Sequence, residues 1–177
     1  MVERKKLSVN ETLRFANHDF LNDLQIISMN LQLGKVEEAL QWIRLLSEQS
    51  QKSSMLHKLP LPLTIEWLLT AKWRYPEFHF SISCDQIEKL ALHDSVDMQL
   101  ASYLEETIMQ FIKSIDPLQE QYMNLQFVFD RTLQLQCEVK GKWEETFHLP
   151  DPKGLIEINV ALQSEEQLIW TIKVDCL

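Results

Sequence analysis

Apolar residues recur at alternating three- and four-residue steps in the first part of the chain, which predicts a long amphipathic helix. This heptad-like seam includes one polar position, Asn17, and its apolar members are Leu13, Phe20, Leu24, Ile27 and Leu31. Ser8 and Glu11 have the Ser-x-x-Glu spacing of a capping box, so we expect the helix to begin near residue 9. Gly34 provides the turn at which it should stop.

A second amphipathic stretch follows this turn, with its apolar positions at Val36, Leu40, Ile43 and Leu46. Two antiparallel helices are therefore expected. Polar residues crowd positions 47–58, and Pro60 and Pro62 oppose helix continuation, which indicates a linker near residues 55–62. We predict a helical hairpin over residues 1–56 and a second domain over residues 57–177.

The second part of the chain combines helical periods with strand-like alternation. Helices are expected from Leu63 to Arg74 and from about Ser95 to Ile115, the latter with Asp94 or Ser95 as N-cap. The alternating stretches predict strands near 78–84, 123–129, 133–139, 143–149, 156–162 and 168–174. The predicted fold class is α+β, with two helices covering the sheet as an α/β sandwich.

The helical hairpin is expected to dimerise. In a hairpin, each helix covers only one side of the other. The two helices therefore cannot bury both the surface through which they pair and the apolar seam, and one of these surfaces stays exposed. A second copy would complete a four-helix bundle. The alternative is that the hairpin packs against its own sheet domain.

Composition limits the classes of partner and compartment. A chain of 177 residues with 45% apolar residues can bury a substantial core. The net charge of −9 lies entirely in residues 57–177, while residues 1–56 are balanced, so nucleic acid is an unexpected partner. No apolar signal region or run of ~18 apolar residues is present, which favours a cytoplasmic protein without a membrane segment.

The sequence does not predict a metal site. Cys84, Cys137 and Cys176 are far apart and lack CxxC spacing, so we expect small apolar residues rather than metal ligands or disulfides. The spacing of His57, His93 and His148 likewise does not suggest a metal centre.

A second stripe of the first helix is mostly polar and carries a histidine. Its members are His18, Asn22, Gln25 and Met29, with Arg14 one turn before the histidine. The imidazole therefore borders the seam without belonging to it. A surface histidine of no consequence is the alternative interpretation.

The run from His18 to Ile27, His-Asp-Phe-Leu-Asn-Asp-Leu-Gln-Ile-Ile, carries a family resemblance together with the hairpin of residues 31–40. It resembles the phosphoacceptor helices of the sporulation initiation phosphotransferase B family, and the equivalent segment of citrate- and fumarate-type sensor kinases. Many relatives place an arginine immediately before the histidine, where this chain has Asn17. Arg14, one helical turn away, is a candidate to replace that charge.

The resemblance implies a phosphorelay phosphotransferase in the control of sporulation initiation. His18 would accept a phosphoryl group from the phospho-aspartate of one response regulator and pass it to a second regulator. The regulator would supply Mg²⁺, because phosphoryl transfer depends mainly on positioning and charge neutralisation. Asp19 would hold the imidazole tautomer or shape the docking surface, and Asn22 and Gln25 would contact the regulator. The partners implied are a second copy of the chain and two response regulators.

The second domain looks like a histidine-kinase ATPase domain without its nucleotide site. The chain has three glycines, Gly34, Gly141 and Gly154, too few for glycine-rich phosphate loops. Thr107 stands where the kinase helix has an Mg²⁺-binding asparagine, and residues 149–154 are too short for a lid. We therefore expect no bound ATP, which disfavours an ATP-dependent kinase. A non-catalytic dimer that sequesters response regulators or pairs with kinases is the alternative function.

Overall fold

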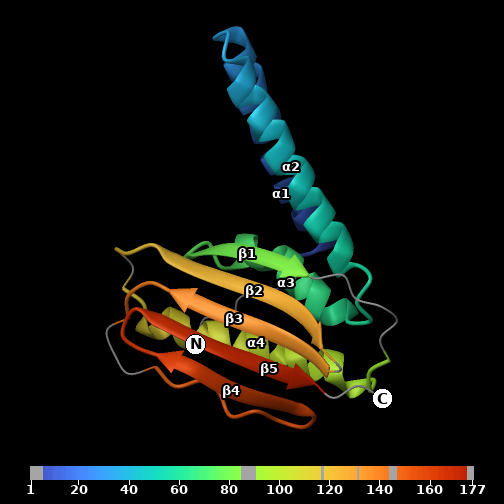
Figure 1. The fold of residues 1–177 in the computed structure, drawn as a ribbon, viewed down its shortest axis with the longest axis vertical. Helices are drawn as coiled ribbons and strands as arrows, with labels where there is room; N and C mark the ends of the chain where they lie inside the picture. Colours follow the sequence, from blue (N-terminus) through green and yellow to red (C-terminus); the bar gives the residue numbers. More distant parts are fainter. Residues whose placement is uncertain (1–5, 85–90, 117, 131, 144–146, 175–177) are drawn as a thin grey trace. The chain divides into compact units, whose positions relative to one another are not determined.

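The computed structural model describes residues 6–84, 91–116, 118–130, 132–143 and 147–174. The chain divides into two compact units, Met1–Ser54 and Met55–Leu177. Its helices are α1 (Val9–Gln32), α2 (Val36–Leu56), α3 (Pro62–Arg74) and α4 (Ser95–Ser114). Its strands are β1 (Phe78–Cys84), β2 (Gln121–Asp130), β3 (Thr132–Lys140), β4 (Ile156–Gln163) and β5 (Gln167–Val174). Three helices precede the first strand, α4 follows it, and the last four strands complete one mixed sheet, so the fold class is α+β as predicted (Figure 1).

The start of α1 is fixed by the predicted capping box. The backbone N–H of Glu11 donates to Ser8 Oγ at 3.3 Å, and the backbone N–H of Ser8 donates to Glu11 Oε2 at 2.8 Å. Two amides that lack helical partners are thereby satisfied. The helix accordingly begins at Val9, which confirms the sequence-based start.

The end of α1 is a Schellman turn centred on glycine. The backbone N–H of Lys35 donates to the carbonyl of Asn30 at 2.8 Å, and that of Gly34 donates to Leu31 at 3.1 Å. Gly34 adopts φ = +73°, which glycine reaches without the steric cost of a β-carbon. The chain therefore reverses at Gly34 as expected, and α2 begins two residues later.

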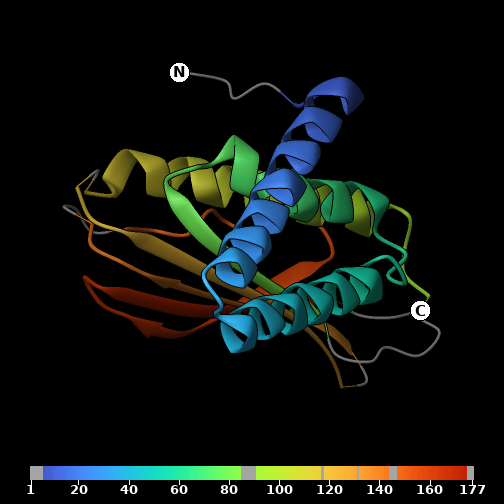
Figure 2. The ribbon, with the colours of Figure 1, turned by 90° about the horizontal axis from the view of Figure 1, so that it is seen from above.

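The hairpin buries few of its own side chains. Ala39 of α2, close to the turn, is 1% exposed, whereas no residue of α1 is buried. Figure 2 shows α1 and α2 leaving the turn in different directions. The hairpin consequently leaves much of its apolar surface uncovered.

The stretch that follows the hairpin is more ordered and more apolar than the sequence suggested. α2 continues through the polar residues to Leu56, and α3 begins at Pro62. Leu56, Leu59 and Leu61 are 2%, 4% and 0% exposed, and they belong to the core of the second unit. The connection between α2 and α3 falls at residues 57–61, within the predicted linker near residues 55–62, but three leucines in this stretch anchor it to the core.

The five strands form one mixed sheet in the order β1-β2-β3-β5-β4. β1 pairs parallel with β2, and the other neighbours are antiparallel. The predicted strand over residues 143–149 is wrong for its described part. Trp143 makes an isolated bridge to Ile115, residues 147–149 lie outside any strand, and residues 144–146 lie outside the described part of the chain.

α3 and α4 lie against one face of this sheet, as predicted (Figures 1 and 2). Alternate residues of β3 and β5 are buried against these helices, and Trp170 and Phe111 are 0% exposed. This alternation is typical of a sheet with one solvated face. Cys137 is a buried free thiol and Cys84 a partly buried one, while Cys176 lies outside the described residues.

A carboxylate from α4 caps the start of α3. Asp97 accepts hydrogen bonds from the backbone N–H groups of Leu63 and Thr64, both at 2.8 Å, and is 8% exposed. The N-cap residue of α3, Leu61, has no side chain that can do this. Asp97 therefore serves as the cap of a helix to which it does not belong.

Replacing Asp97 with alanine should lower the free energy of unfolding by about 2–4 kcal/mol, because two buried amides lose a charged acceptor. Urea unfolding monitored by tryptophan fluorescence would measure the loss. Asp94→Ala is the matched control, since Asp94 is exposed and makes no capping bond. Equal stability of the two variants would contradict the assignment.

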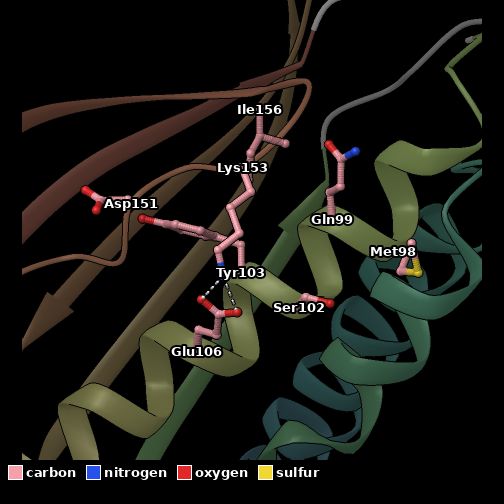
Figure 3. Close-up of a pocket in the computed structure, with 8 residues that line it drawn as sticks. All are labelled: Met98, Gln99, Ser102, Tyr103, Glu106, Asp151, Lys153 and Ile156. Carbon is pink, nitrogen blue, oxygen red and sulfur yellow. Dashed lines mark hydrogen bonds and ion pairs between the residues drawn. The ribbon is translucent and has the colours of Figure 1, made fainter.

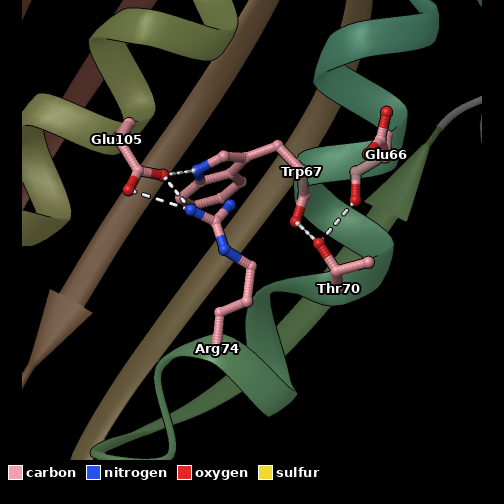
Figure 4. Close-up of polar contacts among 5 residues, drawn as sticks. All are labelled: Glu66, Trp67, Thr70, Arg74 and Glu105. Carbon is pink, nitrogen blue, oxygen red and sulfur yellow. Dashed lines mark hydrogen bonds and ion pairs between the residues drawn. The ribbon is translucent and has the colours of Figure 1, made fainter. Parts of the chain in front are cut away.

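A second polar contact ties α3 to α4 (Figure 4). Glu105 accepts from Trp67 Nε1 at 2.7 Å and from Arg74 at 2.8 and 2.9 Å, and the Arg74 side chain is 9% exposed. Thr70 donates to the carbonyl of Glu66 within α3. Both contacts of Arg74 come from its Nη2, so one guanidinium nitrogen bridges the two carboxylate oxygens in a charge-assisted hydrogen bond.

Candidate functional site

His18 lies in the first half of α1, with 72% of its side chain exposed. Asn22 Nδ2, one helical turn further on, lies 3.2 Å from His18 Nδ1. Asp19 Oδ1 lies 3.8 Å from the same nitrogen. Both contacts involve Nδ1, so Nε2 is the ring atom directed away from these neighbours.

These contacts bear on which ring nitrogen can act as a nucleophile. A neutral imidazole carries one N–H and one lone pair. The amide of Asn22 can present its nitrogen to Nδ1 or, after a half-turn, its oxygen. The amide nitrogen faces Nδ1 in the structure and can donate to it in the tautomer with its proton on Nε2. The tautomer with its proton on Nδ1 and its lone pair on Nε2 needs an acceptor at Nδ1, which the Asn22 oxygen after a half-turn or the nearby Asp19 carboxylate can supply.

Helix geometry places His18 on a third side of α1. At about 100° per residue, the seam lies roughly 140° from His18, and the half-buried side of the helix lies roughly 105° away in the other direction. The half-buried residues include Thr12, Phe15, Asp19 and Ile26. The seam residues Leu13, Phe20, Leu24 and Leu31 are 57%, 61%, 45% and 52% exposed. Covering the seam with a partner would thus leave His18 in solvent.

The structure brings together three of the five residues singled out from the sequence: His18, Asp19 and Asn22. The Arg14 guanidinium lies over the ring of Phe15, 5.5 Å from its centroid. Arg14 and Gln25 share the exposed side of α1 with the histidine, but the described contacts of the imidazole do not include them.

Sequence reasoning missed Leu21, which lies one turn beyond His18 and is 56% exposed. It is a large apolar residue on the histidine side of the helix rather than in the seam. Helical spacing alone could have identified it, because the solvated side of an amphipathic helix normally carries polar residues rather than leucine.

The second unit contains a cavity of about 250 Å³ between α4 and the segment of residues 151–156 (Figure 3). Lys153 Nζ lies 3.0 and 3.1 Å from the two carboxylate oxygens of Glu106, and Gln99 Oε1 accepts from the backbone N–H of Leu155 at 2.8 Å. Burial raises the pKa of Tyr103, so its phenol stays protonated. The lining residues are Met98, Gln99, Ser102, Tyr103, Glu106, Asp151, Lys153 and Ile156.

Two of these polar side chains, Gln99 and Lys153, hold the 151–155 segment onto α4. Gly154 has φ = +74°, and a β-carbon there would meet Gln99 at 2.4 Å, so this glycine serves a turn and a close approach. Thr107 is fully buried in α4. The described residues contain no group of three potential metal ligands among their His, Cys, Asp and Glu side chains.

Within the described part of the chain, no helix is both long and apolar enough to cross a membrane.

Comparison with known proteins gives a family match and likenesses to solved structures. Residues 1–59 match the family model described as "Sensor_kinase_SpoOB-type, alpha-helical domain". None of the curated proteins matches the chain. A solved structure to which the chain is similar is the Erythrobacter litoralis EL346 blue-light activated histidine kinase, with 11% sequence identity and a TM-score of 0.45. The similarity covers 98% of this chain and 62% of that one, so the chain spans less than two thirds of that kinase.

The family match covers the hairpin and therefore the helix that carries His18. A helical domain of this type fits a protein of two-component signalling. Residues 1–59 are thus similar to the SpoOB type of sensor-kinase alpha-helical domain.

Proposed function

We propose that this protein is a phosphorelay phosphotransferase, in which His18 takes a phosphoryl group from the phospho-aspartate of one response regulator and delivers it to the aspartate of another. The family of the hairpin supports a role in two-component signalling. Control of sporulation initiation follows from the resemblance of residues 18–40 to the sporulation phosphotransferases. The protein would act in the cytoplasm.

The exposure of His18 is the observation that carries this proposal. A histidine that exchanges phosphate between proteins must be reachable by two protein active sites in turn. The His18 side chain is 72% exposed, and its described contacts leave Nε2 facing away from the helix neighbours. An imidazole buried in the hairpin could not perform this exchange.

The transfer step needs little from the protein besides a positioned nucleophile. The Nε2 lone pair attacks the phosphorus atom, and the bond from phosphorus to the aspartyl oxygen breaks, so the regulator regains its carboxylate. Positive charge develops on the ring, and the Asp19 carboxylate near Nδ1 stabilises it. The second regulator's aspartate reverses these events. Mg²⁺ belongs to the acidic pocket of the regulator, and no ATP takes part.

A homodimer is part of the proposal. The exposed seam of α1 needs a cover, and a second hairpin offers the same seam in a self-complementary arrangement. The resulting four-helix bundle would present two copies of His18 on its outside.

A labelling experiment tests the proposed function. Receiver domains from the source organism's response regulators are phosphorylated with labelled acetyl phosphate and mixed with the full chain and Mg²⁺. We expect acid-labile label on this chain, which then moves to a second receiver. Absence of label on the chain, despite complex formation, would instead support the alternative of a non-catalytic regulator-binding dimer. Label acquired from ATP alone would contradict the proposal in favour of a kinase.

Asn22 offers a test of the ring orientation. Asn22→Ala should slow transfer about tenfold, because the imidazole loses the contact that selects its tautomer and rotamer. Asn22→Asp should restore most of the rate, since its carboxylate accepts from Nδ1. Initial rates of label transfer measure both variants, and equal rates for alanine and wild type would exclude the orienting role.

A further inference from the structure

We infer that the cavity beside α4 binds a small uncharged molecule, with an apolar body the size of one ring and a carbonyl oxygen that accepts a hydrogen bond from Tyr103. The site lies wholly in the second unit, and the inference is independent of the phosphoryl transfer proposed for His18. The observation that carries it is a buried hydroxyl group without a partner.

The Tyr103 hydroxyl is buried and unsatisfied. The residue is 3% exposed, and within the described part of the chain its oxygen makes no hydrogen bond. The hydroxyl of Thr107, one turn further along α4, is buried without a hydrogen bond as well. Buried tyrosine hydroxyls usually find a partner, because an unpaired one loses the hydrogen bonds that water would give. Figure 3 shows the Tyr103 side chain reaching from α4 toward Asp151 along the cavity that both residues line.

The phenol keeps its proton and can therefore donate. Burial raises the pKa of Tyr103, the neighbouring Thr107 hydroxyl opposes this in part, and the carboxylates of Asp151 and Glu106 add to the increase. The O–H group is thus intact at neutral pH. A ligand in the cavity satisfies this donor by presenting an acceptor oxygen.

The size and walls of the cavity limit the apolar part of the ligand. Met98, Ile156 and the ring of Tyr103 contribute apolar surface to the lining. An apolar cavity of about 150 Å³ holds one benzene molecule, whereas pockets for drug-sized ligands span about 300–1,000 Å³. At about 250 Å³, this cavity has room for one ring with a short polar group.

The charged side chains of the lining disfavour a charged ligand. Lys153 and Glu106 are paired with each other, at 3.0 and 3.1 Å, and Asp151 adds a second carboxylate. An anion would therefore meet a lining in which carboxylates outnumber cations. A cation would lose its hydration at the apolar walls, and the buried hydroxyl groups carry no charge to replace it. A neutral carbonyl group avoids both costs.

Benzamide is the probe for this site, because it combines one ring with a carbonyl group. Titration of the isotope-labelled full chain, followed by the backbone NMR signals of Ser102 and Ile156, measures its Kd, which we expect at about 1 mM or below. Benzoate and benzylamine have nearly the same shape but carry a charge, and each should bind at least ~10-fold more weakly. ADP should not compete, because its phosphates are charged and it exceeds the cavity.

Tyr103→Phe removes only the hydroxyl oxygen. The Kd of benzamide should rise about tenfold, whereas that of toluene, which lacks an acceptor oxygen, should stay unchanged. The Tm of the ligand-free variant should equal or exceed that of the wild type, because the hydroxyl has no protein partner to lose. Tyr122→Phe, which removes the hydroxyl of a 45% exposed tyrosine in β2, is the matched control and should bind benzamide as the wild type does.

Several results would overturn the inference. NMR signals that stay fixed at the highest soluble benzamide concentration would show that the cavity does not admit this class of ligand. Tighter binding of benzoate, benzylamine or ADP would assign the site to a charged ligand. Equal benzamide affinity in Tyr103→Phe and wild type would exclude the phenol as the donor, and a lower Tm of the variant would give its hydroxyl a structural role. None of these measurements involves His18 or a receiver, so the proposed function stands or falls separately.

Discussion

Replacing His18 with glutamine is expected to abolish phosphoryl transfer, lowering the rate at least ~10³-fold. Glutamine keeps a polar side chain and a high helix propensity, but its amide nitrogen has no available lone pair for attack on phosphorus. His18 is largely exposed, so its loss should leave the fold and its unfolding free energy nearly unchanged. The measurement is the initial rate of label transfer from a phosphorylated receiver domain to the full chain.

His57→Gln is the matched control for this experiment. His57 is also exposed, immediately after the end of α2, and its replacement should leave the transfer rate at the wild-type value. Transfer that survives His18→Gln but is lost in His57→Gln would move the phosphoacceptor to the second residue. Loss in both variants would point to a defect of folding, which circular dichroism would reveal.

The elements that could be predicted from the sequence are those set by local signals. The start of α1 follows from Ser8 and Glu11, and its end from Gly34, because each signal acts within a few residues. The bounds of β1 follow from period-two alternation in the same way. The candidate site was also local, since His18, Asp19 and Asn22 lie on adjacent positions and turns of one helix.

The features that could not be predicted depend on contacts between distant segments. Residues near Trp143 alternate as a strand would, but Trp143 pairs with Ile115 in a single bridge instead of joining the sheet. The cap of α3 comes from Asp97, more than thirty residues further along the chain. The polar residues and prolines around Leu59 and Leu61 indicate a linker. The two leucines are nevertheless buried, because they pack into the core of the second unit.

Two details of the site also needed coordinates. The sequence places Asn22 one turn beyond His18, but the contact with Nδ1 rather than Nε2 depends on side-chain rotamers. Helical spacing makes Arg14, one turn before His18, a candidate to supply positive charge near the histidine. In the structure, its guanidinium lies over the ring of Phe15. Side-chain direction is set by packing that a one-dimensional pattern does not encode.

The dimer proposed for the hairpin makes a second prediction with a large effect. Leu24 lies in the middle of the seam and is 45% exposed in the single chain, so a partner would bury it near the centre of the interface. Leu24→Glu would place a carboxylate, and its symmetry mate, in that apolar interface. Burying an unpaired charge costs several kcal/mol, so we expect the dimer Kd to rise at least ~10²-fold.

Sedimentation equilibrium over a range of concentrations measures this effect, with the wild type near twice 20.9 kDa and Leu24→Glu near 20.9 kDa. Gln32→Glu adds the same charge to the same helix on the exposed histidine side, roughly 100° from the seam, and should remain dimeric. Leu24→Ala, which removes apolar area without adding charge, should weaken the dimer less. Near-ultraviolet circular dichroism from the buried Trp67 and Trp170 reports whether the second unit stays folded. A wild-type chain that sediments as a monomer, or a Leu24→Glu variant as dimeric as Gln32→Glu, would contradict a four-helix bundle built on the seam.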